Sequence, residues 1–150
     1  MKTYRIVISL LFIFICFSSC TKDPWVNIDK GIIDQEISFG SCIPPTLTQA
    51  EYIIDTDSIY QKLLSNSVCS SYSLPYIDFT QYTLLGKYAS GQCEVEFHRQ
   101  VIKDDVAKTY NFTVYVFDRG KCKKEAIDMN WVTVPKLPQD YSVVFTIKHD

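Results

Sequence analysis

Few side chains in this sequence have the type and spacing that catalysis needs. The chain contains two histidines, His98 and His149, and no Gly-x-Ser-x-Gly sequence, so a serine triad is not indicated. Glu94 and Glu96 are an acidic pair that a strand would place on one face, whereas a glycosidase needs carboxylates on opposite walls of a cleft. We therefore expect no enzymatic activity and no cofactor. A hydrolase of unfamiliar type is the alternative, and it would need a buried acidic pair or a histidine in a pocket.

The first twenty residues have the layout of an export signal. Lys2 and Arg5 are followed by an apolar stretch at 6–17, which is too short to span a membrane as a helix. The sequence FSSC at 17–20 resembles a bacterial lipobox, in which the cysteine becomes the first residue of the mature chain and is acylated. We expect a signal peptide at 1–19 and a lipid on Cys20; an ordinary secretory signal or an uncleaved anchor is the alternative.

The residues after Cys20 indicate in which membrane the protein is anchored. Position 21 is Thr rather than Asp, so the commonest inner-membrane retention signal is absent. The sequence TKD at 21–23 resembles the start of the Lys-acidic export signals of Bacteroidetes lipoproteins. The resemblance implies an anchor in the outer membrane, with surface exposure as a further hypothesis. We expect a lipidated tether at 20–31 and one globular domain at 32–150.

Four cysteines remain in the expected mature domain: Cys42, Cys69, Cys93 and Cys122. In an exported protein they predict two disulfides, for which three connectivities exist. Cys93 and Cys122 have the strand phase of neighbouring apolar residues and could meet at the open end of a hairpin, so we favour Cys42–Cys69 with Cys93–Cys122. No two of the four have Cys-x-x-Cys spacing, and we expect no metal site.

One short helix is expected to cover one side of the core. Ser58 and Gln61 have the spacing of a capping box at its start. Apolar residues then follow at helical spacing and predict one buried stripe, formed by Ile59, Tyr60, Leu63 and Leu64.

Strands account for most of the remaining domain. Apolar and polar residues alternate at 93–98, 110–116 and 141–148, which predicts half-buried antiparallel strands. Shorter strands are expected at 32–39, 52–54, 82–85 and 131–134, and a hairpin turn at 103–105. The fold class is therefore α+β, mostly antiparallel β with five to seven strands in a sandwich or open barrel, and one short helix.

Charge and aromatic content indicate which classes of partner the protein could bind. The formal net charge of −2 argues against nucleic acid, because phosphate contacts need a surplus of Lys and Arg. Ten tyrosines and nine phenylalanines suit packed strands. Four strand tyrosines could instead stack on a small ligand such as a carbohydrate: Tyr82, Tyr88, Tyr110 and Tyr115.

Residues 74–148 resemble the C-terminal domain of PrcB-type proteins, which are associated with a protease complex. The matching segments are IDFTQYTLLG at 77–86, WVTVPKLP at 131–138 and YSVVF at 141–145. Ser90-Gly91-Gln92-Cys93 stands where that family has a Gly-Gly or Gly-Tyr pair. The resemblance implies a small β domain in an exported accessory protein. We expect a non-catalytic cell-envelope lipoprotein that acts as a protein-interaction or accessory, inhibitory module, held to the membrane by its lipid.

Overall fold

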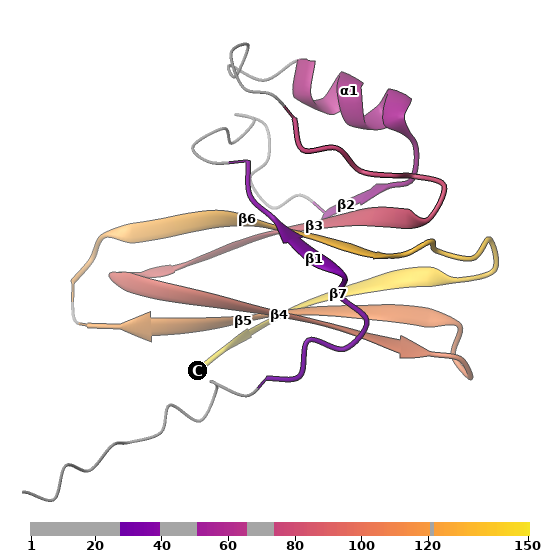
Figure 1. Cartoon of the computed structure of the whole chain (residues 1–150). Coiled ribbons are helices and arrows are strands. Elements are labelled where there is room, and N and C mark those ends of the chain that lie inside the picture. The colour runs from indigo at the N-terminus through magenta and orange to yellow at the C-terminus, as the bar shows by residue number, and fades with distance from the viewer. Residues whose placement is uncertain (1–27, 40–50, 66–73, 121) are drawn as a thin grey trace, which may run out of the picture.

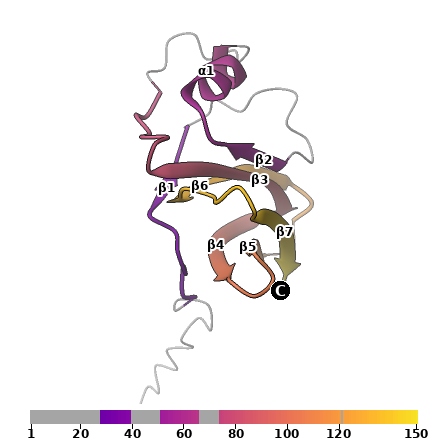
Figure 2. The same cartoon turned by 90° about the vertical axis from the view of Figure 1, so that its right-hand side faces the viewer.

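Two stacked β-sheets and one helix make up the part of the chain that the computed structural model describes, namely residues 28–39, 51–65, 74–120 and 122–150. The helix lies on the outer side of the four-stranded sheet (Figures 1 and 2). In chain order the elements are β1 (Gln35–Ile37), β2 (Glu51–Ile54), α1 (Asp57–Ser65), β3 (Tyr82–Gln92), β4 (Glu94–Asp104), β5 (Thr109–Arg119), β6 (Glu125–Pro135) and β7 (Ser142–His149). The α+β sandwich predicted from the sequence is confirmed.

The strand orders follow from where the chain passes between the sheets. The four-stranded sheet has the order β1-β6-β3-β2, and the three-stranded sheet has the order β4-β5-β7. All pairs are antiparallel except β5 with β7, so the prediction of an antiparallel last strand was wrong. The reason is connectivity: β6 runs back along the other sheet and returns the chain to the end where β5 begins. Ser142 is therefore paired with Thr109, and β7 runs parallel to β5.

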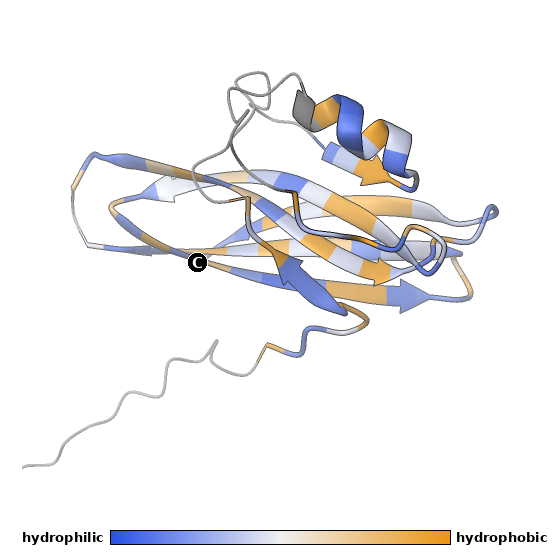
Figure 3. Ribbon diagram, turned by 45° about the horizontal axis from the view of Figure 1, so that its top comes forward, coloured by the Kyte–Doolittle hydropathy of each residue, from blue (hydrophilic) through white to orange (hydrophobic). Residues whose placement is uncertain are grey.

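The layer between the two sheets is apolar and confirms the period-two alternation. From the three-stranded sheet, four alternate residues of β5 are at most 2% exposed: Tyr110, Phe112, Val114 and Val116. They belong to one buried cluster with residues of the opposite sheet, including Leu85, Ala89, Val132 and Val134. Figure 3 shows the corresponding change between hydrophobic and hydrophilic residues along the strands.

A second apolar cluster lies between the four-stranded sheet and the segment that carries α1. Its buried members are Phe39, Ile54, Tyr60, Ile77, Leu84, Met129 and Trp131, and we call this side of the sheet the covered face. The Trp131 ring is 5.4 Å from the rings of Phe39 and Tyr52. A Cβ atom at Gly86 would lie 2.3 Å from the indole, so Trp131 rests directly on the backbone of β3.

The helix starts earlier than its predicted capping box. The Thr56 carbonyl accepts a hydrogen bond from the amide of Tyr60 at 3.1 Å, and the Thr56 hydroxyl accepts one from the amide of Ile59 at 3.4 Å. Thr56 is therefore the N-cap rather than Ser58. Tyr60 is 1% exposed as predicted, whereas Ile59 is 49% exposed and lies outside the buried stripe.

The segment just before β1 lies along the edge of β4. The amide of Val101 donates to the carbonyl of Lys30 at 3.1 Å, and the amide of Ile32 donates to the carbonyl of Val101 at 2.9 Å. Gly31 between them has a φ of 67°, and a Cβ atom there would lie 2.0 Å from the Val101 oxygen, so only glycine fits. The last residues of the expected tether thus protect one edge of the three-stranded sheet.

Candidate functional site

The outer side of the three-stranded sheet is not covered by any helix or strand that the structure describes (Figure 2). We call it the open face. Because paired residues share one side of a sheet, its members can be read from the register: His98, Gln100 and Ile102 on β4, Asn111, Thr113, Tyr115 and Phe117 on β5, and Val144, Thr146 and Lys148 on β7. Ile102 and Val144 are 42% and 45% exposed, so the open face offers apolar as well as polar groups.

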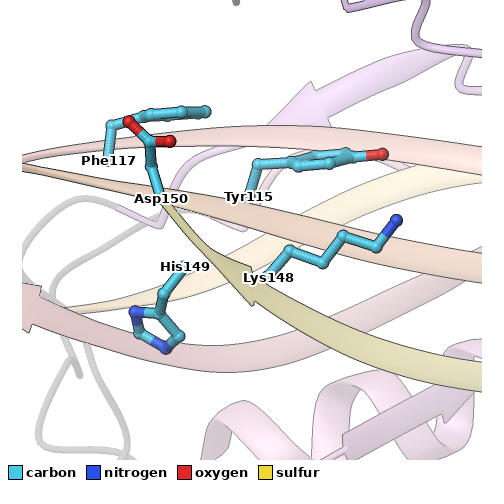
Figure 4. A pocket seen from close by; sticks show the side chains of 5 residues that line it. All are labelled: Tyr115, Phe117, Lys148, His149 and Asp150. Atoms are coloured by element: carbon cyan, nitrogen blue, oxygen red, sulfur yellow. The ribbon is translucent and has the colours of Figure 1, made fainter.

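A hollow of about 270 Å³ lies at the C-terminal end of β7. It is lined by Tyr115, Phe117, Lys148, His149 and Asp150 (Figure 4). The ammonium group of Lys148 lies 5.3 Å from the centre of the Tyr115 ring, and the Tyr115 hydroxyl donates to Gln100 Oε1 at 3.1 Å. The His149 ring points away from Tyr115 and Phe117 in Figure 4. This arrangement offers an aromatic surface beside one ammonium and one carboxylate group.

His98 occupies a packed position on the open face rather than a fully solvated one. Its ring meets the Phe117 ring edge-on, with centroids 5.4 Å apart. Its Nε2 lies 3.6 Å from Glu96 Oε2, and the same oxygen accepts from Arg119 at 3.3 Å. Phe117 is 6% exposed, so this group of side chains buries it although it belongs to an outer face. His98 therefore contributes mainly an aromatic contact.

A charged cluster that the sequence analysis missed lies between the sheets. Arg99 of β4 donates to Glu36 at 2.8 Å and to Asp128 at 3.0 Å, which connects β4 with β1 and β6 of the other sheet. Burial raises the pKa of Asp128, and Arg99 only partly offsets it. Burial acts in the same direction on Glu36, but Lys30 and Arg99 together hold the pKa of Glu36 below its usual value. The guanidinium stands between the carboxylates, so the cluster joins the sheets.

The alternation along β4 could have predicted that Arg99 takes part in a charged cluster between the sheets. Arg99 lies in the phase of Val95, Phe97 and Val101, whose side chains all face the inner layer. A charged residue at an inward position requires an opposite charge nearby. The sequence could not show which acidic residue would meet it, because Glu36 and Asp128 lie far away in the chain.

The structure separates the four tyrosines considered for ligand stacking. Tyr110 is buried between the sheets, and Tyr82 and Tyr88 pack against the cluster of the covered face. Only Tyr115 lies on the open face. The four tyrosines therefore do not form one aromatic patch.

Cys93 and Cys122 are the predicted pair that the structure brings together. Their Cα atoms are 5.2 Å apart and the sulfurs are placed as a disulfide. Cys93 lies between β3 and β4, and Cys122 lies between β5 and β6, so the bond closes the end where the chain passes between the sheets. The other predicted pair, Cys42 with Cys69, and the lipid acceptor Cys20 lie outside the described residues, as does the signal segment 1–19.

Within the described residues, no three or more His, Cys, Asp and Glu side chains are grouped so that they could hold a metal ion. The one helix in that part of the chain is not long and apolar enough to cross a membrane. No family model, no curated protein and no solved structure matches this chain.

Proposed function

We propose that this chain is a non-catalytic lipoprotein of the cell envelope that binds another protein through the open face of its three-stranded sheet. The lipid would be carried by Cys20, and residues after it would connect the anchor to the domain. The PrcB-like pattern at 74–148 supports an accessory or inhibitory role within this proposal.

The observation that carries the proposal is the unequal covering of the two outer sheet faces. The four-stranded sheet buries its outer apolar residues beneath α1 and the segments around it. The three-stranded sheet has no such cover among the described elements, yet Val144 and Ile102 are nearly half exposed on it and Phe117 is fully packed. A face that mixes exposed apolar groups with fixed aromatic and charged ones is suited to a protein partner.

Site-specific photo-crosslinking in native membranes tests this proposal. A photoreactive amino acid would replace Val144 on the open face or Ile59 on α1, which are 45% and 49% exposed and therefore comparably accessible. We expect position 144 to crosslink to one discrete protein and position 59 to give no such product. The same products from both positions, or none from position 144, would contradict the proposal.

The lipid anchor has its own test. We expect the protein purified from native membranes to have an intact mass that begins at Cys20 and includes acyl groups. A Cys20→Ala variant would lose that mass and leave the membrane fraction. An unacylated native mass would remove the anchor from the proposal.

A small-ligand function is the second candidate, and the hollow beside Tyr115 favours it. Its aromatic surface with Lys148 and Asp150 at the rim suits stacking and hydrogen bonding to a carbohydrate. Calorimetric titration with oligosaccharides would show binding that Tyr115→Ala abolishes and Tyr88→Ala leaves intact, because Tyr88 packs against the covered face. Equal effects of the two substitutions would argue against the hollow.

A further inference from the structure

From the free edge of β7, we infer that the three-stranded sheet accepts an extended segment of a partner polypeptide as a fourth strand. The inference rests on the proposed function, since it names the form in which a protein partner would bind. It concerns the edge of the sheet next to the open face.

The two edges of the three-stranded sheet differ. The β4 edge is paired by the backbone of residues 30–32, as described above. β7 is the other edge, and no described strand pairs with its free side. It has eight residues, without proline, and its only lysine, arginine, aspartate or glutamate is Lys148 near its end. An edge of this length without a bulge or proline is a template for strand addition.

The hydrogen-bonding pattern between β7 and β5 shows which backbone groups of β7 are available to bind a further strand. The amide of Ser142 donates to the Lys108 carbonyl at 3.1 Å, and the amide of Asp150 donates to the Val116 carbonyl at 3.2 Å. In a parallel ladder alternate residues bond to the same neighbour, so the even-numbered residues of β7 bond to β5. The N–H and C=O groups of Val143, Phe145 and Ile147 therefore point toward the free side.

Among the strands that the structure describes, the opposite sheet shows that a position is vacant beside β7. It has four strands against three, and β2 is its edge on the same side of the sandwich as β7 (Figure 2). Ile53 of β2 pairs with Leu85, so both side chains face the inner layer. Leu85 is 0% exposed, whereas Ile53 is 44% exposed, since no described strand of the other sheet lies beneath it. A fourth strand beside β7 would cover Ile53.

These features specify the chemistry of the occupant. Its side chains on the inner side must be apolar, because they would meet Ile53 and the half-buried Val143 and Ile147. On the outer side Lys148 lies over the Tyr115 ring and forms no ion pair with a described carboxylate, so an acidic residue beside it would be favourable. The segment is thus strand-forming, apolar at alternate positions and acidic on its outer side.

A second copy of this chain fits the vacancy less well than a separate segment. In each copy β2 extends past β7 in the layer above it. If two copies paired through their β7 strands, their two β2 strands would occupy the same space and clash. A single extended segment has no such second layer. Pairing between two copies is therefore an outcome that would overturn the inference.

A defined peptide tests the inference on the full chain. The probe alternates valine with threonine, carries one glutamate in place of a threonine, and has about the length of β7; a control peptide is N-methylated at its central residues. We expect one-to-one binding of the probe and none of the control, because N-methylation removes the amide donors. The backbone amides of Val143, Phe145 and Ile147 should exchange hydrogen more slowly when the probe is bound.

Two variants locate the site. Val143→Pro removes an amide that faces the free edge and keeps the even-numbered bonds to β5. Ile53→Asp makes the vacant position polar, and Ile59→Asp is its control because Ile59 is similarly exposed but lies on α1, beyond the other face of the four-stranded sheet (Figure 2). We expect Val143→Pro and Ile53→Asp each to weaken binding about tenfold or more, with no change for Ile59→Asp.

Three results would overturn the inference: no binding of the probe to the wild-type chain, equal binding by all variants, or a dimer that Val143→Pro dissolves. Crosslinking from position 144 that survives Val143→Pro would leave the proposed function standing while removing the strand-addition mode. If position 144 gives no crosslinked product in the otherwise wild-type chain, the proposed function itself is contradicted.

Discussion

The covered face and the open face belong to the two sheets of one sandwich, but their side chains are held in different ways. On the covered face Trp131 is 3% exposed and lies between two aromatic rings and the backbone at Gly86. On the open face Tyr115 is half-buried, and its contacts include a hydrogen bond to Gln100 and the ammonium group of Lys148. The first arrangement stabilises the fold by excluding water. The second fixes the position of side chains and leaves them accessible, which is what recognition requires.

The difference between the faces predicts that stability is concentrated on one side. Trp131→Ala should lower the free energy of unfolding by about 3–5 kcal/mol, because it removes a large buried side chain and leaves a cavity above Gly86. Val144→Ala on the open face is the control and should cost less than about 0.5 kcal/mol. Urea unfolding measures both. Similar costs would show that the faces contribute equally.

A substitution in the layer between the sheets should cause the next largest loss of stability. Arg99→Met should destabilise the fold by about 1–3 kcal/mol, since it leaves Asp128 without its cationic partner and Glu36 with Lys30 alone. The expected loss of stability is moderate because the side chains of Glu36 and Asp128 are 33% and 43% exposed and keep some contact with water. Adding Asp128→Asn should recover part of the loss. If the second substitution makes the protein less stable still, Arg99 is not acting as the charge partner of Asp128.

Tyr60 allows a finer measurement on the covered face. Its hydroxyl donates to the Pro75 carbonyl at 2.9 Å, so Tyr60→Phe should cost about 1 kcal/mol at neutral pH. Tyr115→Phe, which removes the bond to Gln100 on the open face, is the matched control and should cost less, because water can replace its partner. Thermal or urea unfolding compares the two. A larger cost at Tyr115 would reverse the proposed difference between the faces.

Alkaline pH should weaken the covered face through the same residue. Burial, together with the charge of Asp57, raises the pKa of Tyr60 to about 12. Since the pKa is higher in the folded than in the unfolded state, the stabilisation is complete below about pH 10 and is lost between about pH 10 and 12. Wild-type stability should fall more steeply than that of Tyr60→Phe over this interval. Parallel pH profiles would show that Tyr60 is not responsible.

A small effect on stability should coincide with a large effect on binding at Tyr115. Tyr115→Ala should change the free energy of unfolding by less than about 1 kcal/mol, because its side chain is only half-buried. Crosslinking of the partner from position 144 should nevertheless be lost or strongly reduced. Unchanged crosslinking would show that the partner does not contact this part of the open face.

Local patterns predicted the elements better than their arrangement. The alternation of Phe112, Val114 and Val116 identified β5 and its buried side, and the shared phase of Cys93 with Val95 pointed to the disulfide with Cys122. The direction of β7 could not be read in the same way, because alternation is identical in parallel and antiparallel strands. Direction depends on the path of β6 through the other sheet, which no local pattern records.

The candidate site shows the same limit. Tyr115 was considered as one of four strand tyrosines, although the alternation along β5 already placed Tyr110 in the apolar phase, where it is buried. The positions of Tyr82 and Tyr88 were not predictable in this way, because they pack against the covered face, and no local pattern shows that the helix segment lies over that side of the sheet. The vacancy beside β7 was not predictable at all, since it results from a mismatch in strand number between the sheets.

The pairing of β1 with β6 has a consequence for how the protein reaches its native state. The Gln35 amide donates to the Thr133 hydroxyl across 98 residues of sequence. During synthesis the N-terminal strand and α1 therefore emerge long before the surface on which they pack. Until residues 125–135 arrive, Phe39 and Tyr52 lack the Trp131 ring on which they pack, and these apolar side chains stay exposed to aggregation. Such long-range closure slows folding, so the completion of the covered face, rather than of the β4–β5 hairpin, should determine how quickly the domain becomes resistant to proteases.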